Sequence, residues 1–220
     1  MPETHTPGQI IILNGTPRSG KSSLAAAIQS KFDGVWMNLG VDGFKGMTPK
    51  RYQPGIGLRP GGERPDLEPV IMTLYCAMYD SIAAHSRLGL NVVVDVGHHD
   101  AYSQPRGILL ACARRLAGLP VLFVGVHCPI EVIMERRRRT GWQVPDDGSI
   151  PKPVAFWQEV VHVPGIYDLE VDTSRLSSDE GADFIWQYLE SGPSSSAFER
   201  LAAMSEQEVE DEGNSEHHLG

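Results

Sequence analysis

The sequence predicts an α/β fold in which a five-stranded parallel sheet carries helices on both faces. Three observations predict it: short, continuously apolar runs, helical patterns between them, and a glycine-rich loop at the first strand-to-helix junction. Continuously apolar strands are typical of parallel sheets that are buried on both faces. At 220 residues and 41% hydrophobic composition, the chain can bury one substantial core, so a single main domain is expected.

The expected elements alternate along the chain. Strands are predicted at residues 9–13, 35–41, 91–96, 121–127 and 168–172. Helices are predicted at residues 22–31, 68–87, 104–117, 130–139 and 179–189. The first strand, QIIIL, is β-branched and apolar, and the helix after it, SSLAAAIQSK, contains no helix breaker. Such alternation indicates βαβ units, whose strands are parallel.

Three segments do not follow this pattern. Residues 43–69 and 141–153 are rich in glycine and proline and are predicted to be functional loops. Residues 191–220 contain seven acidic residues and one arginine, which is −6 of the formal charge of −9. This composition predicts an acidic, disordered tail after a main domain at residues 1–190.

Composition also limits the partners and the compartment. Without the tail, the body of the chain carries only about −3 and lacks the basic surface that would bind nucleic acid. The three cysteines are widely spaced, as expected in a reducing cytoplasm. No stretch approaches the roughly 20 apolar residues that span a bilayer. We therefore expect a cytoplasmic protein that binds neither nucleic acid nor membrane.

The loop after the first strand matches the phosphate-binding pattern G-x-x-x-x-G-K-[ST]. Its glycines allow successive backbone N–H groups to point at phosphate oxygens, and the following helix adds its N-terminal donors. Lys21 is placed to reach the β- and γ-phosphates, and the Ser22 hydroxyl to ligate Mg²⁺. We expect ATP to contact Gly15, Thr16, Pro17, Arg18, Ser19, Gly20, Lys21, Ser22 and Ser23.

A carboxylate at the end of the third strand is a candidate magnesium residue. Asp95 follows the run Val92 to Val94, where phosphate-loop proteins commonly keep an acid that holds Mg²⁺. The next residue is Val96 rather than the acid that activates water in ATP-hydrolysing machines. Because an N-K-x-D guanine motif is also missing, a hydrolysing switch is disfavoured.

A second carboxylate and an arginine run are candidates for the transfer chemistry. Asp42 comes after the second predicted strand, where it could accept the proton of an attacking hydroxyl or could simply be a turn residue. Four consecutive arginines, residues 136–139, come just before the second loop and predict a lid over residues 136–153. We name Arg136 and Arg139 as candidates for phosphate contact, although a solvated basic helix end is the alternative.

Three histidines are not expected to be catalytic. His98 and His99 are adjacent and lack a third ligand at metal-binding spacing, so acceptor-pocket or surface positions are favoured. His162 stands alone and is more consistent with a structural role.

Taken together, the motifs resemble the chloramphenicol phosphotransferase family. The resemblance rests on GTPRSGKSS, GVD at 40–42, VVVDV at 92–96, GVHCP at 125–129, VVH at 160–162 and YDLEVDTS at 167–174. It covers about residues 9 to 190. It implies a nucleoside-kinase-like sheet, ATP as donor, transfer of the γ-phosphate to an antibiotic hydroxyl, and Asp42 as the general base. The chain differs from the family pattern at Val96 and in the Arg- and Pro-rich segment 43–69, which is then an acceptor loop.

The sequence therefore predicts an ATP- and Mg²⁺-dependent kinase of a small hydroxylated molecule, with a chloramphenicol-like antibiotic as the favoured acceptor. One alternative is a kinase of a metabolite, such as a nucleotide, a nucleotide sugar or a biosynthetic intermediate. Another is a nucleotide-binding regulatory module without transfer chemistry.

Overall fold

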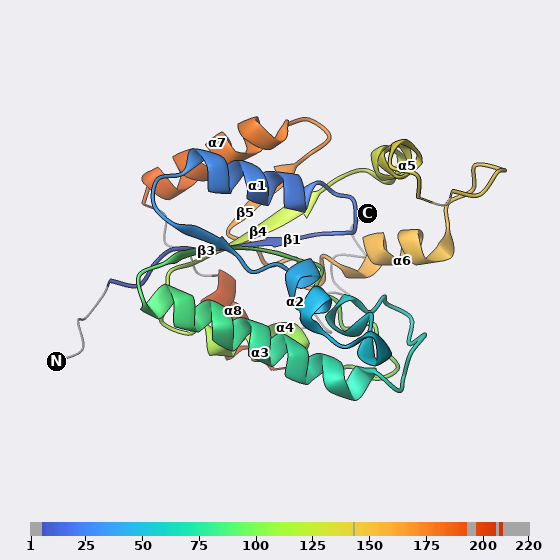
Figure 1. The fold of residues 1–220 in the computed structure, drawn as a ribbon, viewed down its shortest axis with the longest axis horizontal. Helices are drawn as coiled ribbons and strands as arrows, with labels where there is room; N and C mark the ends of the chain where they lie inside the picture. The colour runs from blue at the N-terminus through green and yellow to red at the C-terminus, as the bar shows by residue number, and fades with distance from the viewer. Residues whose placement is uncertain (1–5, 143, 193–196, 206, 209–220) are drawn as a thin grey trace.

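A five-stranded parallel sheet forms the centre of the molecule (Figure 1). The computed structural model describes residues 6–142, 144–192, 197–205 and 207–208. The strands are β1 (Ile10–Asn14), β2 (Trp36–Asn38), β3 (Asn91–Val96), β4 (Val121–His127) and β5 (Leu169–Asp172), in the spatial order β2-β3-β1-β4-β5. Register is continuous through the central strand, with Ile12 of β1 opposite Val94 of β3 and Phe123 of β4. The predicted α/β class and the parallel sheet are confirmed.

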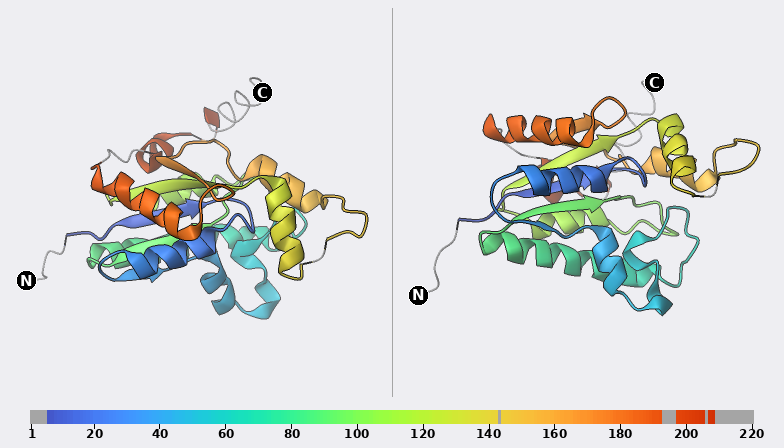
Figure 2. Two further views of the ribbon diagram at one scale, coloured as in Figure 1. Left: turned by 90° about the horizontal axis from the view of Figure 1, so that it is seen from above. Right: turned by 45° about the horizontal axis from the view of Figure 1, so that its top comes forward.

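Helices cover both faces of the sheet, as Figures 1 and 2 show. Helices α1 (Lys21–Lys31) and α7 (Ser178–Glu190) lie on one face, and α3 (Glu68–Arg87), α4 (Ile108–Arg115) and α8 (Ala197–Ala203) on the other. Each face has its own hydrophobic core: the first core lies under α1 and α7, and the second core lies under α3, α4 and α8. Within β1, Ile11 and Leu13 belong to the first core, whereas Ile10 and Ile12 belong to the second. Because each face is covered, every position of the strand is buried, which explains the uninterrupted apolar sequence.

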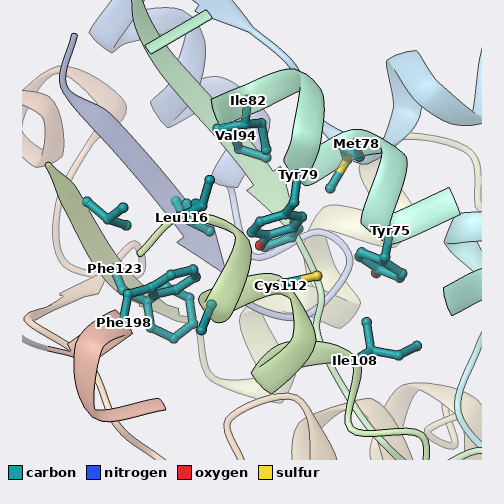
Figure 3. Packing of buried hydrophobic residues seen from close by; sticks show 14 of the residues in the cluster. Tyr75, Met78, Tyr79, Ile82, Val94, Ile108, Cys112, Leu116, Phe123 and Phe198 are labelled. Carbon is teal, nitrogen blue, oxygen red and sulfur yellow. The ribbon is translucent and has the colours of Figure 1, made fainter. Parts of the chain in front are cut away.

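The second core extends into the segment that was predicted to be a disordered tail. Phe198 of α8 packs edge-on against Phe123, with 4.9 Å between ring centroids, and stacks near Tyr79 at 6.4 Å (Figure 3). The Asp168 carboxylate fixes α8 to the sheet, since it accepts hydrogen bonds of 2.9 Å from the backbone N–H groups of Ala197 and Phe123. The tail prediction is therefore wrong for residues 197–203, where three apolar side chains form one buried helical face. Residues 209–220 of that tail lie outside the described residues.

The two predicted loops contain more helix than expected. The acceptor segment holds α2 (Val41–Met47) and two 3₁₀ turns, η1 (Lys50–Tyr52) and η2 (Gly55–Gly57). The glycines in α2 give it low helix propensity, but Val41 and Phe44 pack on the core and stabilise it. After α5 (Ile130–Arg139), helix α6 (Lys152–Val160) begins at the end of the predicted lid. The predicted strand at 35–41 is shortened to β2, because its last residue already belongs to α2.

No helix in the described part of the chain is long and apolar enough to cross a membrane. Cys76, Cys112 and Cys128 are all free thiols.

Candidate functional site

A large cleft opens at the carboxyl ends of the strands, with a volume of about 2040 Å³. Its walls come from the loop between β1 and α1, from α2 and η2, and from α5 and α6, which Figure 1 shows at the same end of the sheet. Ligands of parallel α/β sheets bind at this edge, because the strand-to-helix loops and helix N-termini converge there. Most of the sequence candidates line this one cleft.

The glycine loop forms the base of this cleft. Gly20 adopts φ 101°, and Arg18 also lies in the left-handed region at φ 72°. A Cβ atom on Gly15 would come within 2.4 Å of the Val126 carbonyl oxygen, so this position requires glycine. The hydroxyls of Thr16 and Ser19 are buried and have no hydrogen-bond partner among the described residues. The loop thus has the shape and the unused donors that a bound phosphate chain requires.

Lys21 lies inside the loop, between two carboxylates. Its Nζ donates a 2.7 Å hydrogen bond to the Thr16 carbonyl oxygen. Burial lowers the pKa of Lys21 to about 8, against the opposing attraction of Asp95 and Asp42. The structure therefore brings Lys21, Asp95 and Asp42 into one electrostatic group, although they come from three separate segments.

The predicted metal residues are in direct contact. Ser22 Oγ donates a 2.6 Å hydrogen bond to Asp95 Oδ2. A Cβ atom on Gly40 would lie 1.7 Å from Asp95 Oδ1, so only glycine lets the turn before α2 approach that carboxylate. A hydroxyl and a carboxylate are suitable oxygen ligands for Mg²⁺, which usually takes only one or two protein ligands beside phosphates and water. No cluster of three or more His, Cys, Asp or Glu side chains suited to a metal occurs among the described residues.

Asp42 lies in the first turn of α2 rather than in a turn between elements. Its side chain is exposed and lines the cleft. The tertiary structure thus places this carboxylate at the phosphate loop, which the spacing alone could not decide.

The arginine run of α5 divides between the cleft and solvent. Arg136 donates hydrogen bonds of 3.2 Å to the Arg18 carbonyl oxygen and to Thr173 Oγ1, and one of 2.7 Å to the Thr173 carbonyl oxygen. Arg137 lines the cleft beside it, whereas Arg139 is exposed and is not among the lining residues. Successive helical residues point in different directions, so the predicted pair of Arg136 and Arg139 is replaced at the cleft by Arg136 and Arg137.

Thr173 and Trp142 are among the lining residues that were not sequence candidates. Thr173 follows β5 and donates from its hydroxyl to the Ser19 carbonyl oxygen, which joins β5 to the glycine loop. The guanidinium groups of Arg18 and Arg137 lie over the Trp142 ring, at 4.5 and 5.1 Å from its centroid. Thr173 belongs to the motif YDLEVDTS and could have been found from it, whereas Trp142 carries no sequence signal.

The histidines form buried supports behind the site. His98 contacts the Tyr79 hydroxyl at 2.7 Å, and its backbone N–H donates to Asn14 Oδ1. Burial lowers the pKa of His98 to about 3, with a smaller effect from His99. Burial also lowers the pKa of His99 to about 4, although its bond to the Leu58 carbonyl opposes the shift. Both are therefore neutral, buried residues that do not line the cleft, so neither the expected acceptor-pocket position nor the surface position is correct.

His162 belongs to a network that joins two of the sequence motifs. Its Nδ1 lies 2.8 Å from the Tyr167 hydroxyl, which accepts a 2.8 Å hydrogen bond from Asn14 Nδ2. The same amide donates to the Val161 carbonyl oxygen at 2.8 Å. VVH and YDLEVDTS are thus held together at the end of β1, beside the glycine loop.

Known proteins resemble this chain in sequence and in fold. The model of the family described as chloramphenicol phosphotransferase-like protein matches residues 8–190. The "Putative O-phosphotransferase Rv2636" of Mycobacterium tuberculosis is 29% identical, over 91% of this chain and 89% of that protein. Among solved structures, a shikimate kinase from Acinetobacter baumannii has a TM-score of 0.57 at 12% identity, covering 86% of this chain and 97% of that one. A gluconokinase from Sinorhizobium meliloti has a TM-score of 0.55 at 18% identity, covering 86% and 98%.

The structural likenesses establish the phosphate-loop kinase fold, and the family match covers most of the chain. The protein is a kinase that belongs to the chloramphenicol phosphotransferase-like family.

Proposed function

We propose that this kinase transfers the γ-phosphate of ATP to a hydroxyl group of a small molecule, with Asp42 as the general base. One observation carries the proposal: Asp42, Lys21 and the Ser22–Asp95 pair face one cleft at the edge of the sheet. A nucleotide-binding module without transfer chemistry would not require an exposed carboxylate opposite the phosphate-binding lysine. The convergence therefore supports catalysis rather than binding alone.

The donor side is assigned to the glycine loop and its neighbours. The backbone of residues 15–20 binds phosphate oxygens, and Lys21 neutralises their charge. Ser22 and Asp95 hold Mg²⁺, which, when bound, screens the negative charge of the phosphates. Arg136 and Arg137 supply further positive charge from α5.

The acceptor side is assigned to α2, η2 and α6. Asp42 accepts the proton of the acceptor hydroxyl, whose oxygen attacks the γ-phosphorus of ATP beside Lys21. The bond from that phosphorus to the β–γ bridging oxygen breaks, and ADP leaves. Positioning and charge stabilisation supply most of the rate enhancement in such transfers, so the fixed geometry of the cleft matters more than covalent chemistry.

Family membership makes a chloramphenicol-like antibiotic the first candidate acceptor. A metabolite is the second candidate, and it is favoured by the charged side chains of Lys45 and Arg59 in the acceptor half of the cleft. Both candidates share the same donor site and the same base.

A substitution at Asp42 tests the proposal. Asp42→Asn should retain ATP binding but lose transfer by at least about a hundredfold, since general-base catalysis contributes roughly that much or more. The assay is ADP release with labelled ATP against chloramphenicol, other hydroxylated antibiotics and nucleosides, with mass detection of the product. Asp33→Asn is a matched control because Asp33 is an exposed acid that does not line the cleft.

Two outcomes would contradict the proposal. Unchanged turnover in Asp42→Asn would remove the base assignment. Rapid ATP hydrolysis that no acceptor accelerates, with no phosphorylated product, would replace transfer with hydrolysis.

A further inference from the structure

We infer that the acceptor carries an anionic group, a carboxylate or a phosphate, in addition to the hydroxyl that is phosphorylated, and that Lys45 and Arg59 bind that group. This inference rests on the proposed function, because it describes the acceptor half of the same cleft. Chloramphenicol itself is a neutral molecule, so it lacks the anionic group that this site would bind.

Lys45 is the first cation of the acceptor half. It lies three residues after Asp42 on α2, so both side chains project from one face of the helix, within about one turn or 5.4 Å along its axis. Both line the cleft. A Cβ atom on Gly57 would contact Lys45 Cδ at 3.5 Å, which shows that the lysine stem lies along η2. The Lys45 ammonium group has no acidic partner within ion-pair distance in the described part of the chain.

Arg59 is the second cation and comes from the other side of η2. Its nearest acid is Glu63, with 3.7 Å between Nε and Oε1, and both side chains are about half exposed. That distance is too long for a good hydrogen bond, and exposed pairs of this kind contribute little. Arg59 is therefore available to a ligand, whereas its neighbour Arg64 is held by Asp66 in two hydrogen bonds of 2.8 and 2.9 Å.

Arg59 also faces the cations of the donor half. Burial, followed by the charges of Arg18 and Arg59, lowers the pKa of Arg137. The Arg137 Nε atom is buried without a hydrogen-bond partner among the described residues. Three positively charged side chains, from the glycine loop, the acceptor segment and α5, thus lie close enough to repel one another. A negatively charged ligand would relieve this repulsion.

The charge of the cleft differs from that of the protein. The chain carries −9, yet the cleft is lined by seven basic and four acidic side chains. The donor half accounts for Arg18, Lys21, Arg136 and Arg137, which suit a nucleotide polyphosphate. Of the other three, Arg64 is held by Asp66, and Lys45 and Arg59 remain for a second anion.

An apolar wall completes the acceptor half. Ile56, Tyr75 and Trp157 line the same cleft as the two cations, and all three are buried. They would contact a carbon skeleton that joins the hydroxyl near Asp42 to the anionic group near Lys45. The inferred acceptor is therefore a hydroxylated organic acid or a phosphorylated hydroxy compound.

Sulfate binding to the nucleotide-loaded enzyme tests this site without requiring the natural acceptor. The enzyme is first saturated with Mg²⁺ and the non-hydrolysable analogue AMPPNP, which fills the donor half. It is then titrated with sodium sulfate in a calorimeter at constant ionic strength set with chloride. Saturable sulfate binding is expected, and Lys45→Met or Arg59→Met should weaken it by at least about tenfold, the value of one charged hydrogen bond.

Lys50→Met is the matched control, because Lys50 lies on the same segment but is exposed and does not line the cleft. It should bind sulfate as the wild type does, and AMPPNP binding by each variant confirms that it is folded. Non-saturable sulfate binding, or equal affinity in Lys45→Met and the wild type, would overturn the anion site.

An acceptor comparison keeps this inference separate from the proposed function. Hydroxy acids and their neutral methyl esters are compared in pairs by ADP release and product mass, and the acids should be preferred at least about tenfold in kcat/KM. Equal use of acids and esters would overturn the anion site while leaving phosphotransfer intact. Failure to phosphorylate any acceptor, together with intact sulfate binding, would instead contradict the proposed function.

Discussion

The hydroxyl of Ser22, at the start of α1, donates a 2.6 Å hydrogen bond to the carboxylate of Asp95 in β3. This contact joins the phosphate loop of the central strand to the neighbouring strand, at the edge where the cleft opens. It leaves both side chains within reach of a cation that also contacts the phosphates. The relationship gives the first test of the metal assignment.

Asp95→Asn should raise the Mg²⁺ concentration needed for half-maximal activity by at least about tenfold, because an amide loses the charge that attracts the ion. Mg²⁺ titrations of ADP release measure the effect. Nucleotide binding without Mg²⁺ is the control and should not weaken. An unchanged Mg²⁺ requirement would remove Asp95 from the metal site.

The two arginines named from the sequence should differ in effect. Arg136→Ala should lower turnover by at least about tenfold, since Arg136 contacts the glycine loop and lines the cleft. Arg139→Ala is a matched control on the same helix, and it should remain within about twofold because surface substitutions are usually mild. Steady-state kinetics with a productive acceptor compare them. A larger loss in Arg139→Ala than in Arg136→Ala would contradict the structural placement.

Nucleotide affinity should decrease at alkaline pH. The pKa of Lys21 is lowered to about 8, so its ammonium form is present below that pH and is lost as the pH rises through it. Binding of ADP should therefore weaken above about pH 8, by up to about tenfold per pH unit. Calorimetric titrations between pH 7 and 9.5 measure this. Lys21→Met lacks the titrating group, so its weaker binding should not show this pH dependence.

The buried histidines should make the fold sensitive to acid. A histidine in the unfolded chain has a pKa of about 6.5, whereas burial lowers the pKa of His98 to about 3. Between these values the unfolded state binds the extra proton, so stability falls as the pH decreases below about 6.5, by up to about 1.4 kcal/mol per pH unit for this residue. Urea denaturation at pH values from 7.5 to 4.5 gives the free energy of unfolding at each pH. The decrease of this free energy with falling pH should be shallower in His98→Gln.

Tyr79→Phe is the control for that experiment. It removes the hydrogen-bond partner of His98 but keeps the titrating ring, so the steep acid slope should remain. An equal slope in the wild type and His98→Gln would contradict the buried neutral state.

The helix in the predicted tail should contribute to stability. Phe198→Ala should cost about 3–5 kcal/mol, as is usual for truncating a buried aromatic side chain. Glu199→Ala, on the exposed side of the same helix, should remain within about 0.5 kcal/mol. Urea denaturation compares the two variants. Equal stability of Phe198→Ala and the wild type would contradict the packing of α8 on the core and would support the predicted tail.

The phosphate loop and the central strands could be predicted because their signals are local. A strand buried on both faces must be apolar at every position, and a loop around phosphate requires glycine where a Cβ would collide, as at Gly15. These constraints act on adjacent residues, so they are visible in the chain itself. Helix α2 gave no comparable signal, because its glycines lower its helix propensity and packing on the core stabilises it. Helix α8 consists largely of good helix formers, but the serine-rich and acidic composition around it predicted a tail.

Local patterns in the sequence were enough to predict the fold class, the glycine loop, and Lys21, Ser22, Asp95 and Asp42 as candidate site residues. The folded chain shows which of them meet. Asp42 lies on a helix near Lys21, Arg136 and Arg137 rather than Arg139 line the cleft, and Lys45 and Arg59 line the same cleft. These contacts join residues far apart in the chain, and no local pattern specifies the direction in which each side chain points.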